Sequence, residues 1–142
     1  MTSRYFEDVN VDDELDPREE LPTEDKAIDF FGRDNPTNPA FGDAEAGRKQ
    51  GFGGALVPGL LKMAWITNYV SNWGGPDAHV QSVRMAFRRP DVAGNPLTIA
   101  GRVVDKRKEN EQNIVELECV TLADGQPSVR ANVQVALPSR EG

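Results

Sequence analysis

Hydrophobic residues are densest between Gly51 and Trp73, where a glycine-rich segment leads into a run that is apolar on almost every side of a helix. Pro58 suits the first turn of this helix, because its missing N–H would have no partner there. Gly74-Gly75-Pro76 marks the end. Only Lys62 and a few small polar side chains interrupt the run. Such a helix needs cover on nearly every side, and it is too short and too interrupted to span a bilayer.

From Ala78 onward the pattern changes to a period of two, which indicates β-strands. Asp124-Gly125 predicts a tight hairpin between the last two strands. The connections are too short for helices, so we expect a four-stranded antiparallel meander. A sheet covering one buried helix is an α+β architecture. The four alternating sets begin and end at Val83–Phe87, Leu97–Val103, Val115–Cys119 and Val129–Leu137.

The first third of the chain is more polar. Tyr5–Leu15 predicts a short strand, although its acids lower strand propensity. Thr23 is a candidate N-cap for a helix that ends at Gly32. Residues 33–43 contain two Asn-Pro pairs and predict a loop. Asp43 is expected to cap a short helical turn that reaches Gln50.

Composition limits the function. The 142 residues predict one domain, and a net charge of -7 argues against nucleic acid and anionic membranes as partners. Residues 1–50 hold 14 acids and 6 bases, whereas residues 51–142 hold 9 acids and 10 bases, so an anionic ligand is expected on the second part. The single cysteine, Cys119, excludes an intramolecular disulfide and fits a reducing compartment. MTSRYFEDVN has no signal-peptide pattern, so a cytoplasmic location is expected.

Three segments carry motifs in a particular order and spacing. Pro36–Asp43 is similar to the loop Asp-x-Asn-Pro-x-His-x-Asp, and Ala55–Leu60 is similar to an apolar segment ending in His-Gly. Phe87–Leu97 is similar to Phe-x-x-Pro-Val-x-x-Gly-Asp-x-Leu. Together they resemble the MaoC-like hydratase/dehydratase family, which includes the (R)-specific enoyl-CoA hydratases. The resemblance covers nearly the whole chain and implies a hot-dog fold, in which an antiparallel sheet wraps a long central helix.

The sequence differs from this family at the positions of the family's catalytic residues. There, the aspartate and histidine of the first loop activate the water that adds to the enoyl double bond; the corresponding residues here are Pro36 and Phe41. Neither side chain can accept a proton. A shifted register puts Arg33 and Asn38 at the two positions, which again supplies no base. The resemblance therefore implies a site without its usual dyad.

Other polar residues of the loop are candidate catalytic groups. Asp34, with Asn38 nearby, can orient a water molecule. Alternatively, the two side chains satisfy backbone donors in an Asx-type loop. Both interpretations remain open for Asp34 and Asn38.

The candidate substrate-binding residues lie in two groups. The first leads into the helix N-terminus, where N–H groups and the dipole polarise a carbonyl; the resemblance implies that a backbone N–H there holds the thioester oxygen. The same glycines also suit a tight turn and close packing. The second group is basic and suits the phosphates of coenzyme A. No metal and no cofactor beyond the thioester ligand itself is expected. The residues are Gly53, Gly54, Pro58, Gly59, Arg88 and Arg89.

The favoured hypothesis is an acyl-CoA-binding subunit that forms a homodimer or a heterodimer, in which a MaoC-like partner supplies the aspartate and histidine. One alternative is an active homodimeric enoyl-CoA hydratase that uses Asp34 or Asp43 as the base. A hot-dog thioesterase is a weaker alternative, because the helix from Gly59 to Trp73 carries no carboxylate.

Overall fold

The computed structural model describes residues 2–31, 39–41 and 43–141. Within these ranges, one antiparallel sheet contains five strands: β1 Glu14–Glu20, β2 His79–Phe87, β3 Leu97–Glu109, β4 Gln112–Ala123 and β5 Gln126–Ala136. The helices are α1 Glu24–Phe31, α2 Ala44–Lys49 and α3 Gly59–Gly74, with short 3-10 turns at Phe6–Asp8 and Pro39–Phe41.

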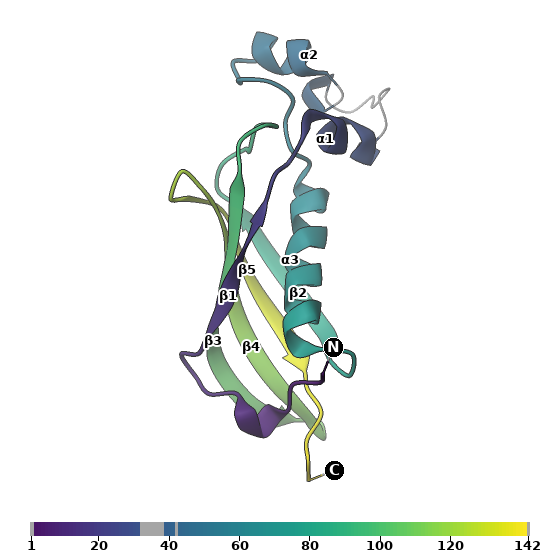
Figure 1. The fold of residues 1–142 in the computed structure, drawn as a ribbon, viewed down its shortest axis with the longest axis vertical. Helices are drawn as coiled ribbons and strands as arrows, with labels where there is room; N and C mark the ends of the chain where they lie inside the picture. Colours follow the sequence, from purple (N-terminus) through teal and green to yellow (C-terminus); the bar gives the residue numbers. More distant parts are fainter. Residues whose placement is uncertain (1, 32–38, 42, 142) are drawn as a thin grey trace.

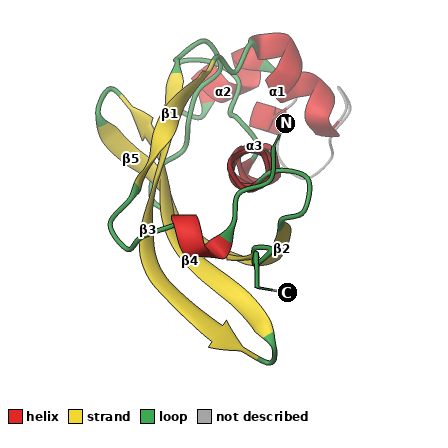
Figure 2. Ribbon diagram, turned by 60° about the horizontal axis from the view of Figure 1, so that its bottom comes forward, coloured by secondary structure: helices red, strands yellow, loops and turns green. Residues whose placement is uncertain are grey.

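Helix α3 lies along the inner face of the sheet (Figure 1). When α3 is viewed nearly end-on, the sheet curves around it from β1 to β2 (Figure 2). Ile66 and Val70 of α3 are fully buried in one cluster with strand residues such as Leu117 and Val133. Each such side chain contributes about 1.5–3 kcal/mol by leaving water. The expected α+β fold, with a sheet covering the apolar helix, is confirmed.

The predicted meander is wrong in one connection. The sheet order is β1-β3-β4-β5-β2, so β3, β4 and β5 form a meander, but β2 pairs with β5 and not with β3. The hairpin at Asp124-Gly125 is confirmed, and both residues have positive φ, 53° and 75°. Alternation identifies a strand but does not say which neighbour it pairs with, because that depends on long-range packing against α3.

The link between β2 and β3 passes beside the segment that leads into α3. The two segments share an isolated bridge between Leu56 and Val92. The Val57 amide donates to the Asp91 carbonyl at 2.8 Å, and the Ala93 amide donates to the Ala55 carbonyl at 2.8 Å. These bonds hold the β2–β3 link against the N-terminal end of α3.

The prediction of a first strand over Tyr5–Leu15 is wrong in position. Phe6–Asp8 is a 3-10 turn, and β1 runs over Glu14–Glu20. This strand has one buried residue, Leu15, and its register against β3 shifts around Pro17. Proline is tolerated here because β1 is an edge strand.

The two short helices lie at the end of the molecule where α3 begins (Figure 1). Helix α1 starts after Thr23, whose hydroxyl accepts from the Lys26 amide at 3.2 Å. Asp43 caps α2 as expected, and its side chain accepts from the Glu45 amide at 3.0 Å. Within the described ranges, no helix has both the length and the apolar character needed to cross a membrane.

Candidate functional site

A pocket of about 380 Å³ opens at the N-terminal end of α3. Apolar side chains form most of its wall, and three cationic side chains join them. A larger hollow of about 570 Å³ lies between β1 and the C-terminal half of α3, but it contains none of the predicted site residues. We therefore take the smaller pocket as the candidate site. Its lining residues are Phe41, Leu56, Val57, Gly59, Lys62, Phe87, Arg88, Arg89 and Pro90.

The start of α3 forms one wall of this pocket. Pro58 is the N-cap with φ -59°, and its carbonyl accepts from the amides of Leu61 and Lys62 at 3.1 and 3.3 Å. Gly59 lets the Phe87 ring come close, because a Cβ on Gly59 would lie 2.7 Å from Cε1 of that ring. Phe87 itself is 54% exposed. The helix dipole therefore points its positive end at a pocket with an aromatic wall.

A buried ion pair lies one turn further along the helix. The Nζ atom of Lys62 donates to Oδ2 of Asp91 at 3.0 Å. Lys62 is 2% exposed and Asp91 4% exposed, so both charges have left bulk water. The Lys62 ammonium also lies 5.6 Å from the centroid of the Phe87 ring. Lys62 lines the pocket. Asp91 is not among the lining residues and contacts Lys62 through this hydrogen bond.

Phe41 lines the pocket from the 3-10 turn Pro39–Phe41. It is the residue that the sequence motif sets at the family's histidine position. Its ring adds apolar surface and has no group that takes a proton. The other candidate positions of the loop, Asp34, Pro36 and Asn38, lie outside the described residues, so their roles stay predictions.

Arg88 and Arg89 lie together at the exposed mouth of the pocket. The Arg88 and Arg89 amides both donate to the Ser128 carbonyl, at 2.7 and 3.2 Å, which fixes the backbone at the end of β2. Nη2 of Arg89 also bonds the carbonyls of Ala123 and Gln126, at 3.3 and 3.4 Å, in the β4–β5 turn. The structure brings these arginines to the helix start, and their binding of phosphate stays a prediction.

Gly53 and Gly54 pack beside the site and are not among the lining residues. Cβ atoms on them would lie 3.8 and 3.6 Å from Cγ1 of Val92. The Gly54 carbonyl faces α2, where a Cβ on Gly47 would come within 1.9 Å of it. The close contact explains the glycine at position 47, whereas the distances at Gly53 and Gly54 are ordinary and do not by themselves require glycine. The part of Gly53 and Gly54 in substrate binding stays a prediction.

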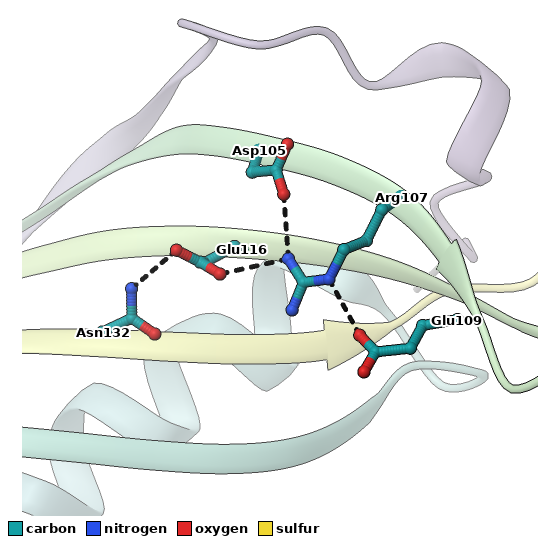
Figure 3. Close-up of polar contacts among 5 residues, drawn as sticks. All are labelled: Asp105, Arg107, Glu109, Glu116 and Asn132. Atoms are coloured by element: carbon teal, nitrogen blue, oxygen red, sulfur yellow. Dashed lines mark hydrogen bonds and ion pairs between the residues drawn. The ribbon is translucent and has the colours of Figure 1, made fainter.

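Arg107 on β3 takes part in a network of ion pairs with carboxylates of β3 and β4. Arg107 pairs with Asp105, Glu109 and Glu116 at 2.9, 2.8 and 3.1 Å, and Glu116 also accepts from Asn132 at 3.0 Å (Figure 3). Arg107 donates hydrogen bonds to Glu109, Asp105 and Glu116, and these bonds raise the pKa of Arg107 above its ordinary value. This cluster neutralises Arg107 far from the pocket.

Cys119 offers no nucleophile. Burial raises the pKa of its thiol to about 12, so the reactive thiolate is absent near neutral pH. Among the described residues, no three His, Cys, Asp or Glu side chains gather closely enough to hold a metal ion.

The sequence interpretation missed the ion pair, and two signals pointed to it. Lys62 is a charge in an apolar helix, and Asp91 stands where the related motif has valine. Each charge alone would be costly in a core. Together they predict a salt bridge, provided that the fold brings residues 62 and 91 into contact.

Comparison with known proteins identifies the fold. No protein-family model and no curated protein matches the sequence. R-hydratase PhaJ1 from Pseudomonas aeruginosa matches with a TM-score of 0.83 at 19% identity, over 96% of this chain and 86% of that one. A MaoC-like dehydratase from Rhodospirillum rubrum gives 0.82 at 21% identity, over 97% and 99%. The ChsH1-ChsH2 complex from Mycobacterium tuberculosis gives 0.78 at 19%, over 90% and 98%.

The chain therefore has a hot-dog fold with a pocket at the start of its central helix. More narrowly, this fold is the one found in MaoC-like dehydratases and (R)-hydratases, as the order of the sequence motifs implied.

Proposed function

We propose that this protein binds an acyl thioester of coenzyme A and is a non-catalytic subunit of an enoyl-CoA hydratase or 3-hydroxyacyl dehydratase. The acyl group enters the pocket at the start of α3, and Arg88 and Arg89 at its mouth contact phosphates. A different MaoC-like chain supplies the aspartate and histidine, because a second copy would again carry Pro36 and Phe41 at those positions.

One observation carries this proposal. Among the described residues that line the pocket there is neither an imidazole nor a carboxylate, and Phe41 occupies the wall where the motif predicts histidine. Water addition to an enoyl thioester needs a general base in contact with the water. A pocket with apolar and cationic walls supports binding better than proton transfer.

Two features favour this reading over its alternatives. Asp43, one candidate base, is exposed and already accepts the Glu45 amide as an N-cap. Asp91 is a carboxylate beside the central helix, as a thioesterase would need, but it pairs with Lys62 and is not among the lining residues. The solved ChsH1-ChsH2 complex contains a chain with this fold and is an assembly of two named proteins, which supports a partner subunit as one route to activity.

The purified chain tests the proposal. We expect isothermal titration calorimetry with a short saturated acyl-CoA to show binding, and we expect no hydration of 2-enoyl-CoA and no release of free CoA. Sustained hydration by the chain alone would favour the active homodimer, and CoA release would favour a thioesterase. Arg88→Gln/Arg89→Gln should weaken binding of every CoA ligand. Arg84→Gln, on β2 just before these arginines and outside the pocket, is the matched control.

A further inference from the structure

A stabilising role alone is a weak explanation for the buried ion pair between Lys62 and Asp91. Replacing a buried ion pair by apolar residues often leaves stability unchanged or improves it, so such a pair is weak evidence of a stabilising role. This pair lies at a pocket wall, where Lys62 is in contact with the space that a ligand would fill. The position points to recognition of a ligand.

The hydrogen-bonding capacity of Lys62 exceeds what Asp91 takes up. An ammonium group has three N–H donors and no acceptor, and the bond to Oδ2 of Asp91 uses one of them. The Phe87 ring, 5.6 Å away, contributes only its π-face. A ligand atom that comes within hydrogen-bonding distance of the Lys62 ammonium must therefore be a hydrogen-bond acceptor.

Charge balance selects the kind of acceptor. Lys62 and Asp91 together are neutral, and both are buried. A carboxylate beside this buried pair would add a net negative charge to it and would lose its own water, which is costly. Arg88 and Arg89, the other cations of the pocket, are exposed, so water screens their attraction. A carbonyl oxygen accepts the same hydrogen bond without adding net charge. The positive end of the α3 dipole, one turn away at Gly59, favours the same oxygen.

We propose that Lys62 donates a hydrogen bond to the thioester carbonyl oxygen of the ligand, and that Asp91 is a positioning residue that orients Lys62 and keeps the site neutral. The pocket thereby selects uncharged acyl thioesters over analogues that present a carboxylate. This inference rests on the proposed function, because it assigns a role within the same pocket.

Three ligands separate the two claims: butanoyl-CoA, S-butyl-CoA, which lacks the carbonyl, and S-carboxymethyl-CoA, which presents a carboxylate. Calorimetry on the wild type should show about tenfold tighter binding of butanoyl-CoA than of S-butyl-CoA, the effect of one charged hydrogen bond. In Lys62→Met/Asp91→Leu, binding of butanoyl-CoA should fall to the level of S-butyl-CoA, which itself should not change. Circular dichroism melting checks that the variant folds.

Asp91→Asn tests the positioning role through ligand preference, a quantity that should not change if Asp91 only stabilises the fold. Removing the carboxylate charge leaves Lys62 as an uncompensated cation, so affinity for S-carboxymethyl-CoA should rise relative to butanoyl-CoA. Arg84→Gln should leave all three affinities unchanged.

The outcomes are distinguishable. If the wild type binds none of the three ligands, the proposed function fails and the inference fails with it. If it binds butanoyl-CoA and S-butyl-CoA equally, or if Lys62→Met/Asp91→Leu keeps the preference, thioester binding stands and the role of Lys62 is overturned. An unchanged ligand preference in Asp91→Asn overturns the positioning role of Asp91.

Discussion

Lys62 and Asp91 are two buried charges, one on α3 and one on the link between β2 and β3. Their attraction offsets the cost of removing each charge from water, and neither charge is tolerable without the other. The stability of this part of the molecule therefore depends on the pair as a unit.

This dependence predicts strongly non-additive mutations. Asp91→Ala should lower the free energy of unfolding by about 3–5 kcal/mol, because Lys62 is left buried without a partner. Lys62→Met/Asp91→Leu should unfold at a urea concentration close to or above that of the wild type, since no charge is left buried. Equal destabilisation in the single and double variants would contradict this account.

Residue burial also predicts the alkaline stability. Burial raises the pKa of Cys119 from 9.0 to about 12 and that of Tyr69 from 10.0 to about 12. In the unfolded chain both groups ionise at lower pH than in the fold, so the unfolded state binds fewer protons above pH 9. The free energy of unfolding should be constant with respect to these groups below pH 9 and should fall as the pH rises towards about 12.

Urea denaturation at several pH values measures this slope. Cys119→Ala should flatten it most between pH 9.0 and 10.0, where the thiol of the unfolded chain is more ionised than the Tyr69 phenol. Tyr69→Phe should flatten it above pH 10.0. A wild-type slope that neither variant changes would mean that other groups control the alkaline transition.

At the scale of elements, α2 packs closely against the segment that leads into α3. A Cβ on Gly47 would lie 1.9 Å from the Gly54 carbonyl oxygen, and backbone has to move to relieve that overlap. A Cβ on Gly53 would meet only Val92, at an ordinary 3.8 Å. The two glycines therefore differ in what they tolerate although they lie close together.

Gly47→Ala should destabilise the protein by about 1–3 kcal/mol, the usual cost of overpacking, and Gly53→Ala should stay within about 0.5 kcal/mol of the wild type. Thermal unfolding measures both. Because Gly53→Ala should fold normally, loss of acyl-CoA binding in this variant would support the predicted binding role of Gly53. Equal destabilisation by both changes would refute the packing account.

Elements that are determined by residues close together in the sequence were predictable. Helix α3, the caps at Thr23 and Asp43, and the Asp124-Gly125 hairpin follow from apolar pattern, capping and turn chemistry. Strand β1 was not predictable, because its hydrogen bonds come from the edge of β3 and its own sequence contains Pro17 and four acids.

The site was predictable in part. The motif segments located the start of α3 and Arg88 and Arg89 beside it, since order along the chain carries that information. The ion pair was not located, because residues 62 and 91 meet only through the pairing of β2 with β5 and the return of the chain past α3. Whether a charge in an apolar helix is buried is decided by such long-range contacts.

At the scale of the whole molecule, the two faces of the sheet have different roles. The inner face packs on α3. The other face carries ion pairs between strands, among them Arg102 with Glu118 at 3.9 Å and Arg130 with Glu118 at 3.6 Å, which fit contact with water better than burial under another layer. Under the proposed function, we therefore expect the partner at an edge strand, β1 or β2, or at the end of the molecule that bears the pocket.

The central claim is that this pocket holds an acyl thioester but cannot by itself activate water. A single-turnover experiment in oxygen-18 water tests it most directly, with the protein in excess over 2-butenoyl-CoA so that all ligand is bound. We predict binding with no oxygen-18 at the β-carbon above the protein-free background, as read by mass spectrometry. Incorporation on the time scale of a working hydratase would contradict the claim, because a base of this same chain would then be acting on water.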